Sequence, residues 1–557
     1  MKKNIIFLAI IFIAIIFRFS ALGKIPISLY WDEAAVGYNA YSILLTGKDE
    51  YGNFFPLLFR SFEDYKMPAY VYLTTIPIGF FGLNEFSVRF VSAFAGVTAV
   101  LLTYFLTRLL FIQFSSSQKN ILKEKSNAIA LLGSFLLAIS PWHLQFSRTG
   151  FEANVALTTF LAGFYFFFRS FLNQKYFPFA FFFFTLSFYL YRSIFIFLPV
   201  VLIGLLIIFR RELFSLERRG KTIMTLIVFI ICITPITYAV FFGPGRVRAD
   251  QVSVFRHSQE ALSENLQKQQ EGNTYISRVL YNRRITYARI TIQNYLSHFS
   301  PAFLFLSGDG NGRHTVKNMG VLYRWEIPFL LLGFFLILRE KSKLRLIIIL
   351  WIFAAPLAAS LATPSPHALR SLNMLPVPQI LTATGITFVF FKLQRRYRIA
   401  FFLLMILVVS LFFNQYWKEY NYHNTVTASA DWADGYKQLV SEVQKREKDY
   451  DKIVISGYYW QPYIYFLFYT RYDPYLFQHS GKKERFGKYV FGGTEWDKDR
   501  GRSELHNVDL VRFAGSRNIL VALSPSEYQA HSNELQKITE IKNAKNDTIF
   551  ILGSLRK

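Results

Sequence analysis

Long apolar runs recur along the chain, and short polar stretches separate them. At about 1.5 Å of rise per residue, each run is long enough, or nearly so, to cross a bilayer as a helix. Eleven runs lie at 4–22, 86–111, 127–141, 154–171, 177–190, 194–209, 222–241, 326–338, 345–361, 372–391 and 399–413. The pattern predicts a mainly α-helical, polytopic membrane protein with about 11 to 13 transmembrane helices. The first run lacks a cleavage signal, so we expect it to remain as a membrane helix.

Basic residues lie in every second loop, which orients the predicted helices. The cytoplasmic side of a membrane protein carries the Lys and Arg excess of short loops. We therefore predict a cytoplasmic N-terminus and a multi-pass protein of the cell (plasma or inner) membrane. The outer side then receives 23–85, 140–152, 191–193, 242–325, 362–370 and the chain after about 414.

Three outer segments have helical patterns of their own. Residues 32–46 place apolar side chains at helical spacing, and Gly47 is a suitable stop; the apolar positions are Val36, Ala40, Ile43 and Leu44. Residues 67–82 and 274–299 read as helices that lie in the membrane interface. These segments would stand at the outer membrane surface.

The last part of the chain changes composition. It is more polar, and β-like runs at 452–456, 518–523 and 548–552 alternate with helix-like stretches near 435–447 and 461–470. We predict a catalytic membrane domain over 1–413 and a small extracytoplasmic α/β domain over 414–557. A linker near 414–434 would join them.

Composition and charge agree with this interpretation. Apolar residues make up 52% of the 557 residues, and 61 are Phe, which is unusual for a soluble protein. The net charge of +26 could suggest nucleic acid, but the basic inner loops explain it, and we expect no nucleic-acid partner. The single cysteine excludes a disulfide within the chain.

The stretch "LYWDEAAVGYNAYSILLTG" (29–47) places Asp32 and Glu33 where the chain leaves the membrane. Asp32 could be a helix N-cap, and Glu33 would suit the helix dipole. Adjacent residues of a helix point in different directions, so the two acids would address different partners. One could face a cavity while the other orients it or binds a cation.

Further charged residues accumulate on the same predicted side. Each has an ordinary explanation as well, namely a local ion pair, snorkelling to headgroups or a flexible loop. Together they pair carboxylates with cations from five separate segments; the candidates are Asp64, Lys66, Arg148, Glu152, Arg192, Arg313, His314, His367 and Arg370. This inventory suits an anionic lipid phosphate beside an acceptor that must lose a proton.

Transfer of a sugar from a polyprenyl phosphate needs such residues. The departing phosphate needs positive charge, for which Lys66, Arg148, Arg313 and Arg370 are candidates. The acceptor hydroxyl needs a base within hydrogen-bond reach, and we expect Asp32 to be that base, with inversion at the anomeric carbon. A divalent cation held by carboxylates among Asp32, Glu33 and Asp64 would also be compatible.

Three short motifs carry a resemblance to a known family: "WDE" at 31–33, D-Y-K-x-P at 64–68, and S-P-x-x-x-x-x-S-R-x-G-x-E at 140–152. The chain resembles the GT-C membrane glycosyltransferases, above all the bacterial protein O-mannosyltransferase-like family (glycosyltransferase family 39). That family has relatives that transfer aminoarabinose to lipid A. The resemblance covers about 1–413 and is strongest over 28–155.

The resemblance implies a GT-C architecture and a dolichyl- or undecaprenyl-type phosphate sugar donor. The acceptor would be a hydroxyl on a protein, a lipid or a glycan. It also implies that Asp32 is the catalytic base with Glu33 as its neighbour, and that Lys66 contacts donor phosphate. Glu152 matches a position where many relatives have aspartate. Arg313 and His314 match the family pattern only loosely.

Two other classes of protein remain as alternatives. A transporter or flippase of lipid-linked sugars would place polar features near the membrane midplane, often in repeated halves. Here the polar features lie at one face, and no repeat is evident. A membrane scaffold would not need the set of acids and arginines.

Overall fold

The structure is a computed structural model that describes residues 2–116, 121–257, 282–459, 461–492 and 505–556. The chain divides into two compact units. Unit 1 comprises Met1–Ser20 and Ser92–Glu419, and unit 2 comprises Ala21–Val91 and Tyr420–Lys557. Residues 21–91 thus pack with the C-terminal part of the chain rather than with the helices that precede and follow them. This grouping differs from the sequence-based boundary at 413, and the limit of the catalytic domain stays a prediction.

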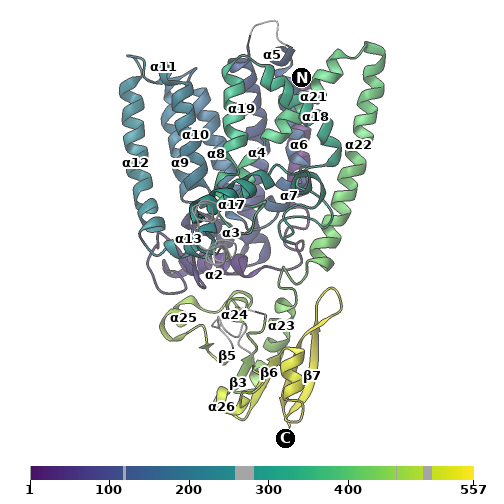
Figure 1. The fold of residues 1–557 in the computed structure, drawn as a ribbon. Coiled ribbons are helices and arrows are strands. Elements are labelled where there is room, and N and C mark those ends of the chain that lie inside the picture. The colour runs from purple at the N-terminus through teal and green to yellow at the C-terminus, as the bar shows by residue number, and fades with distance from the viewer. Residues whose placement is uncertain (1, 117–120, 258–281, 460, 493–504, 557) are drawn as a thin grey trace, which may run out of the picture. The chain divides into compact units, whose positions relative to one another are not determined.

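Unit 1 is a helical bundle (Figure 1). Its long helices are α1 (Lys2–Phe19), the part of α4 (Glu85–Phe114) after residue 91, α6 (Ser126–Ala138), α8 (Glu152–Arg169), α9 (Phe177–Phe188), α10 (Ile194–Ile208), α12 (Arg219–Phe241), α17 (Arg283–Ser297), α18 (Ile327–Arg339), α19 (Lys343–Ala354), α21 (Val377–Lys392) and α22 (Arg395–Tyr422) up to residue 419. Each of the eleven predicted apolar runs forms a helix. Runs of Leu, Ile and Phe with few breakers favour helices when all backbone groups must bond internally.

Short elements connect these helices. They are α5 (Ile121–Glu124), α7 (Pro141–Ser147), η1 (Gln174–Tyr176), α11 (Arg210–Leu213), α13 (Arg246–Val252), α14 (Val254–His257), η2 (Ala302–Leu306), η3 (Arg324–Glu326), α20 (Leu357–Ser360) and η4 (Leu372–Met374). The helix predicted at 274–299 is present as α17 from residue 283, and its place in the membrane interface stays a prediction. Its first part, 274–281, lies outside the described residues.

Several helices are long and apolar enough to cross a membrane. Among the described residues there are five, or six if the bent pair α6 and α7 forms one span; the five are Glu85–Phe114, Arg219–Phe241, Lys343–Ser360, Leu372–Lys392 and Arg395–Thr427. Other predicted spans are shorter apolar helices, such as Ile194–Ile208. The chain is a multi-pass membrane protein, and the count of 11 to 13 spans stays a prediction.

Small residues set the closest helix packing in unit 1. A Cβ added at Gly333 of α18 would lie 1.9 Å from the backbone oxygen of Leu381 in α21. The reverse contact exists as well, because a Cβ at Gly385 would lie 2.1 Å from the backbone oxygen of Phe329. Helices in membranes often pack by such close backbone approach. Lipid tails are as apolar as the helix side chains, so the hydrophobic effect does not drive the helices together. The α18–α21 pair therefore depends on these two glycines.

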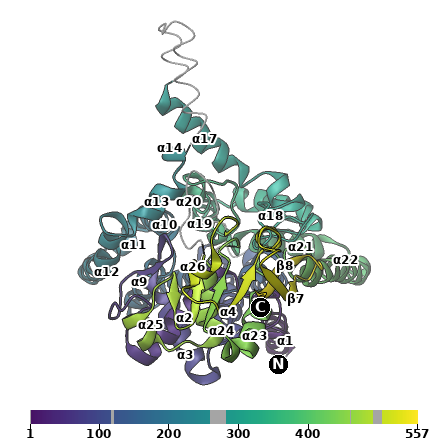
Figure 2. The same cartoon turned by 90° about the horizontal axis from the view of Figure 1, so that it is seen from below.

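Unit 2 begins with the segment that follows α1, Ala21–Val91. Helices α2 (Trp31–Thr46) and α3 (Pro68–Phe81) lie side by side (Figure 2), and the hairpin β1 (Phe59–Ser61) and β2 (Asp64–Lys66) connects them. Gly47 ends α2 in the left-handed conformation, as predicted. Leu44 was expected on the buried apolar face of α2, but it is 46% exposed, so the prediction is wrong at this position. Most of α2 is buried all round, because α24 (Pro462–Thr470) packs on it as well as α3.

The C-terminal part of unit 2 contains a mixed sheet of order β4-β5-β3-β6-β8-β7. Its strands are β3 (Lys452–Ile455), β4 (Arg485–Phe486), β5 (Tyr489–Phe491), β6 (Ile519–Leu523), β7 (Leu535–Lys542) and β8 (Thr548–Leu555), and its helices are α23 (Tyr436–Arg446), α24, α25 (Pro474–Ser480), α26 (Leu510–Ala514) and α27 (Pro525–Ala530), with the turn η6 (Glu447–Asp449). Strand β3 is parallel to β5 and β6, and the remaining pairs are antiparallel. The predicted α/β fold of this part is present.

The linker predicted at 414–434 is wrong for its first half. Helix α22 continues to Tyr422, and a π-helical turn, η5 (His423–Thr427), follows. Polar residues after 413 suggested a break, but Tyr416 and Tyr420 are buried and keep the helix packed. Trp432 then anchors the chain, since its ring contacts Tyr30 and its indole N–H donates to Asn424 Oδ1 at 3.0 Å.

The close contact at Gly333 predicts that one added methyl group destabilises unit 1. Gly333→Ala would push a Cβ into the backbone of α21, so we expect a loss of about 1–3 kcal/mol in stability. Gly220→Ala is the matched control, because a Cβ there meets no atom within 4 Å. Thermal unfolding of both variants in detergent measures the difference. An unchanged midpoint for Gly333→Ala would contradict this packing.

Candidate functional site

The acid pair lies in the first turn of α2. The helix begins at Trp31 with Tyr30 as its N-cap, and no side chain caps it. The N-cap interpretation of Asp32 is therefore wrong. The helix dipole still favours both carboxylates at this end. The next two contacts show that the acids address different partners, as their helical spacing predicted.

Asp32 contacts a lysine supplied by the β1–β2 hairpin. Lys66 Nζ lies 3.1 Å from Asp32 Oδ1 and 3.6 Å from Asp64 Oδ2. The hairpin brings Lys66 to this position because Ser61 pairs with Asp64 and Phe59 pairs with Lys66. The side chains of Lys66 and Asp32 are 19% and 25% exposed, so solvent or a ligand can reach them. The structure thus joins three sequence candidates in one cluster.

Glu33 points the other way, into the interior of unit 2. Its carboxylate accepts two hydrogen bonds from Arg89 of α4, at 3.0 Å from Nε and 3.2 Å from Nη2. Both side chains are 0% exposed. Arg89 also donates to the carbonyls of three residues that lead into α2, namely Leu22, Pro26 and Ser28. Such a bidentate pair with further carbonyl partners fixes both charges in place.

The three acids proposed for a divalent cation each face a side-chain cation. Lys66 lies between Asp32 and Asp64, and Arg89 holds Glu33. A metal ion at Asp32 and Asp64 would have to displace the ammonium group. In this arrangement the carboxylates bind and position Lys66.

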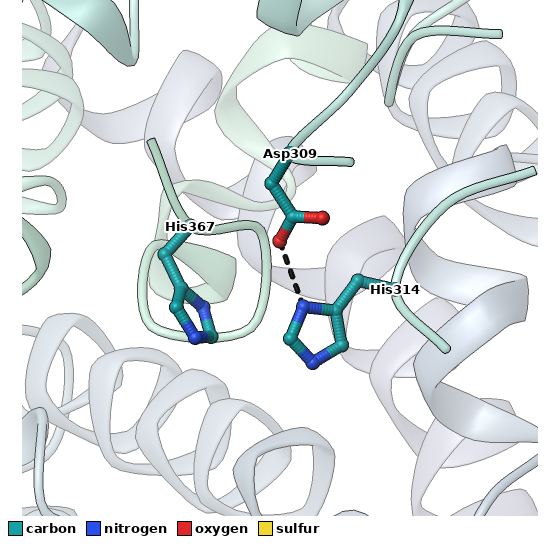
Figure 3. A group of neighbouring side chains, drawn as sticks. All are labelled: Asp309, His314 and His367. Atoms are coloured by element: carbon teal, nitrogen blue, oxygen red, sulfur yellow. Dashed lines mark hydrogen bonds and ion pairs between the residues drawn. The ribbon is translucent and has the colours of Figure 1, made fainter. Parts of the chain in front are cut away.

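A second cluster lies in the loops of unit 1 and contains two predicted residues, His314 and His367. In Figure 3 both imidazoles lie beside Asp309, and His314 Nδ1 donates to Asp309 Oδ2 at 2.7 Å. The backbone N–H of Ala368 donates to the same oxygen at 2.9 Å. Burial alone would raise the pKa of Asp309, but the neighbouring His314 and these hydrogen bonds lower it. Asp309 is thus held as a buried carboxylate.

The trio of Asp309, His314 and His367 could hold a metal. Its three ligand atoms lie within 4.8 Å of one another. Burial, followed by the nearby positive groups, lowers the pKa of His367 well below its usual value, which leaves the neutral form that ligates metals. Two imidazoles and a carboxylate suit a zinc-type ion better than magnesium.

Three further candidates lie near a partly buried tyrosine, Tyr191, between α9 and α10. Burial raises the pKa of its phenol, and the charges that act on it belong to Arg370, Glu152, Arg248 and Arg192. Backbone carbonyls fix two of the guanidinium groups: Arg192 Nη1 donates to Gly245 O at 2.7 Å, and Arg370 Nη1 donates to Thr363 O at 3.0 Å. These residues form a cationic cluster with one acid.

Two candidate arginines have contacts within the fold. Arg148 is fully buried, donates to the carbonyl of Phe17 in the last turn of α1 and to that of Ser20 just after α1, and lies over the Trp417 ring. Arg313 contributes its backbone oxygen to Gln145 Nε2 at 2.8 Å. For Arg148 the contacts favour a role in holding α1 over direct contact with phosphate.

Sequence reasoning missed Arg89, Tyr191 and Arg248, and assigned no role to Asp309. Arg89 carried a usable signal, because a charge inside an apolar run of membrane length marks a paired or functional residue. Asp309 stood in a glycine-rich loop, where an aspartate is ordinary. Only the fold brings it next to His314 and His367.

The buried Glu33–Arg89 pair predicts that losing its arginine costs much more stability than losing the lysine of an exposed ion pair. Arg89→Leu would leave the Glu33 carboxylate buried without its cation, so we expect a loss of about 3–5 kcal/mol. Adding Glu33→Gln to Arg89→Leu should recover part of it, since the unpaired charge is gone. Lys445→Ala, which breaks an exposed pair with Glu442, should cost about 1 kcal/mol or less. Equal thermal midpoints for Arg89→Leu and Lys445→Ala would contradict this assignment.

The trio of Asp309, His314 and His367 predicts bound metal. We expect purified wild type to hold close to one zinc-type ion per chain, and His314→Gln and His367→Gln to lose it, because each removes one of three ligands. His479→Gln is the control, since His479 is exposed and lies outside the trio. Elemental analysis of the four proteins decides, and metal-free wild type would make the trio a hydrogen-bond network only.

Comparison with known proteins agrees with these features. Residues 66–238 match the family described as dolichyl-phosphate-mannose-protein mannosyltransferase. The fold is similar to ArnT from Cupriavidus metallidurans in the apo state, with 11% identity and a TM-score of 0.53 over 99% of this chain and 97% of that chain.

Two further solved structures are similar. ArnT bound to undecaprenyl phosphate has 11% identity and a TM-score of 0.52 over 99% of this chain and 97% of that chain. Archaeal oligosaccharyltransferase AglB from Archaeoglobus fulgidus, in complex with an inhibitory peptide and a dolichol-phosphate, has 14% identity and a TM-score of 0.51 over 94% and 69%. No curated protein matches the chain by sequence. The predicted resemblance is confirmed: residues 66–238 match a protein-mannosyltransferase family, and the fold is similar to the folds of ArnT and AglB.

Proposed function

We propose that the enzyme moves a sugar from a polyprenyl-phosphate donor to an acceptor hydroxyl on a protein, a lipid or a glycan at the outer face of the membrane. ArnT has been solved with undecaprenyl phosphate and AglB with a dolichol-phosphate, which supports a donor of this class. The observation that carries the proposal is the solvent-accessible Asp32–Lys66 pair beside Asp64. It joins a carboxylate that can accept a proton to a cation that can meet a phosphate.

The chemistry proceeds in one displacement. Asp32 takes the proton of the acceptor hydroxyl as the acceptor oxygen bonds to the anomeric carbon. The bond between that carbon and the phosphate oxygen breaks, and its electron pair leaves with the polyprenyl phosphate. Lys66 stabilises the negative charge that develops on this oxygen. Attack opposite the leaving group inverts the anomeric carbon.

Glu33 and Arg89 support this chemistry without taking part in it. Their buried pair fixes the first turn of α2, so it fixes the direction of Asp32. A base must stand within hydrogen-bond reach of the proton it removes, and small displacements are costly to the rate. We assign Glu33 a positioning role beside the catalytic Asp32.

In unit 1, the cationic cluster is our candidate for further phosphate contacts. Arg192 and Arg370 are oriented by backbone carbonyls. His367 lies in the same loop as Arg370, and its ring centre is 4.8 Å from that of His314. Arginine suits phosphate because its planar donors match two oxygens at once. Glu152 would balance this charge or contact a sugar hydroxyl, and Arg313 stays a candidate without a specific contact to support it.

The base assignment predicts a specific loss. Asp32→Asn keeps the shape of the side chain but accepts no proton, so we expect sugar transfer to fall by about 10²–10⁴-fold. Purified proteins in nanodiscs are supplied with a panel of polyprenyl-phosphate sugars, and transfer is measured for each. Thermal midpoints confirm that the variant is folded. Glu534→Gln, at an acid of unit 2 that is 64% exposed, should behave as wild type.

Two outcomes would overturn parts of the proposal. Equal transfer by wild type and Asp32→Asn would remove Asp32 from the mechanism. Retention of the anomeric configuration in the product would exclude a single displacement even if Asp32 is essential. The panel also identifies the sugar that the enzyme accepts.

A further inference from the structure

Unit 2 contains a polar pocket that the chemistry above does not use. It has a volume of about 350 Å³ and is lined by residues of the loop after α2, of β1, of the end of α25 and of the segment after α25, among them Glu50, Tyr51, Arg60, Gln478, Lys482 and Lys483. A monosaccharide is of a size that such a volume can hold. All its walls belong to unit 2.

Glu50 is an unusual wall residue. Its side chain is 2% exposed, and neither carboxyl oxygen has a hydrogen-bond partner among the described residues. Burial raises the pKa of Glu50 to about 8, although Lys483 acts against this effect. At neutral pH the group is therefore mostly a protonated carboxyl, which can donate one hydrogen bond and accept another. A buried polar group without a partner calls for a ligand or water.

The pocket also gathers positive charge. The Arg60 guanidinium lies 4.9 Å from the centre of the Tyr51 ring, and Lys483 Nζ lies 5.9 Å from it. Burial and the nearby Arg60 lower the pKa of Lys483. Among the described residues, no ion pair engages Arg60, Lys482 or Lys483. Glu63 and Glu484 line the pocket too, so apart from Glu50 the three cations exceed the acids by one charge. One further anion would balance that charge.

Hydrogen bonds within the fold fix the wall of the pocket to which Gln478 belongs. Gln478 of α25 donates its amide to Ser42 Oγ at 2.9 Å, to Thr46 Oγ1 at 3.0 Å and to the Asp49 carbonyl at 2.9 Å. These bonds hold the end of α25 to the end of α2. The pocket is thus preformed, which favours specific binding over a loose surface contact.

We propose that this pocket binds an acidic sugar residue of the acceptor, held as an anion by Arg60, Lys482 and Lys483 and through a hydroxyl by Glu50. The role as an acceptor subsite rests on the proposed glycosyl transfer, whereas the binding itself does not. The acceptor would then be an acidic glycan.

Direct binding tests the pocket independently of catalysis. The full chain in nanodiscs is titrated with glucuronate, glucose and inorganic phosphate, and binding is followed by ligand-observed NMR. We expect glucuronate to bind in the millimolar range, and Lys483→Gln and Arg60→Gln each to weaken it at least tenfold. Lys445→Gln, at an exposed lysine of α23, should leave binding unchanged. Asp32→Asn should retain binding while it loses transfer.

A pH series isolates Glu50. Above its pKa of about 8 the carboxylate repels an anion, so wild-type affinity for glucuronate should fall about tenfold between pH 7 and pH 9. Glu50→Gln keeps a neutral donor and acceptor and should lose less. Asp49, Glu63 and Glu484 are near the pocket as well, but they do not differ between the two proteins.

Three results would overturn the proposal. Glucuronate binding that is absent, or equal in wild type and Lys483→Gln, would exclude the pocket even if sugar transfer is intact. Phosphate binding as strong as glucuronate binding would reduce it to a simple anion site. Identical pH profiles for wild type and Glu50→Gln would remove Glu50 from it. Failure of the transfer assay alone would affect only the assignment to the acceptor.

Discussion

The buried ion pair between Glu33 and Arg89 is the interaction on which the candidate active site depends. Two charges at 0% exposure are stable only when each satisfies the other and the remaining donors find acceptors. Arg89 meets this condition through Glu33 and three backbone carbonyls. The same bonds hold the loop before α2, so the start of the helix cannot turn without breaking the pair. Asp32 is presented outward because its neighbour is fixed inward.

This arrangement separates two tasks that adjacent residues of one helical turn can perform together. Glu33 contributes to the fold, because its carboxylate forms a buried ion pair with Arg89. Asp32, about 100° further round the helix, meets a lysine that stays partly exposed. A dyad in which both acids faced the same cavity would have raised the cost of ionising either one. The geometry avoids this by giving each carboxylate its own cation.

The sequence predicted the helices of unit 1 well, because apolar runs and their breaks directly record which segments can be buried in lipid. It predicted the strands at 452–456, 518–523 and 548–552 from β-branched residues. It did not predict that α2 is buried on nearly all sides, since the helix α24 that packs on α2 comes more than 400 residues later. Nor could it pair Glu33 with Arg89 or bring Asp309 to His314 and His367. Those contacts depend on tertiary packing, for which a single sequence carries no periodic signal.

Lysine and arginine have different uses in the two units. Lys66 is a compact charge on a flexible stem, and it contacts Asp32 and Asp64 without a fixed fork geometry. In the proposed reaction it would exchange a carboxylate for a phosphate oxygen. Arg192 and Arg370 are tied by carbonyls at one edge of the guanidinium, which fixes the direction of the donors that remain. A fixed cation stabilises developing charge without reorganising, whereas a mobile cation can follow it. The proposed reaction binds a charged lipid donor and releases a charged lipid product, so it would use both kinds of cation.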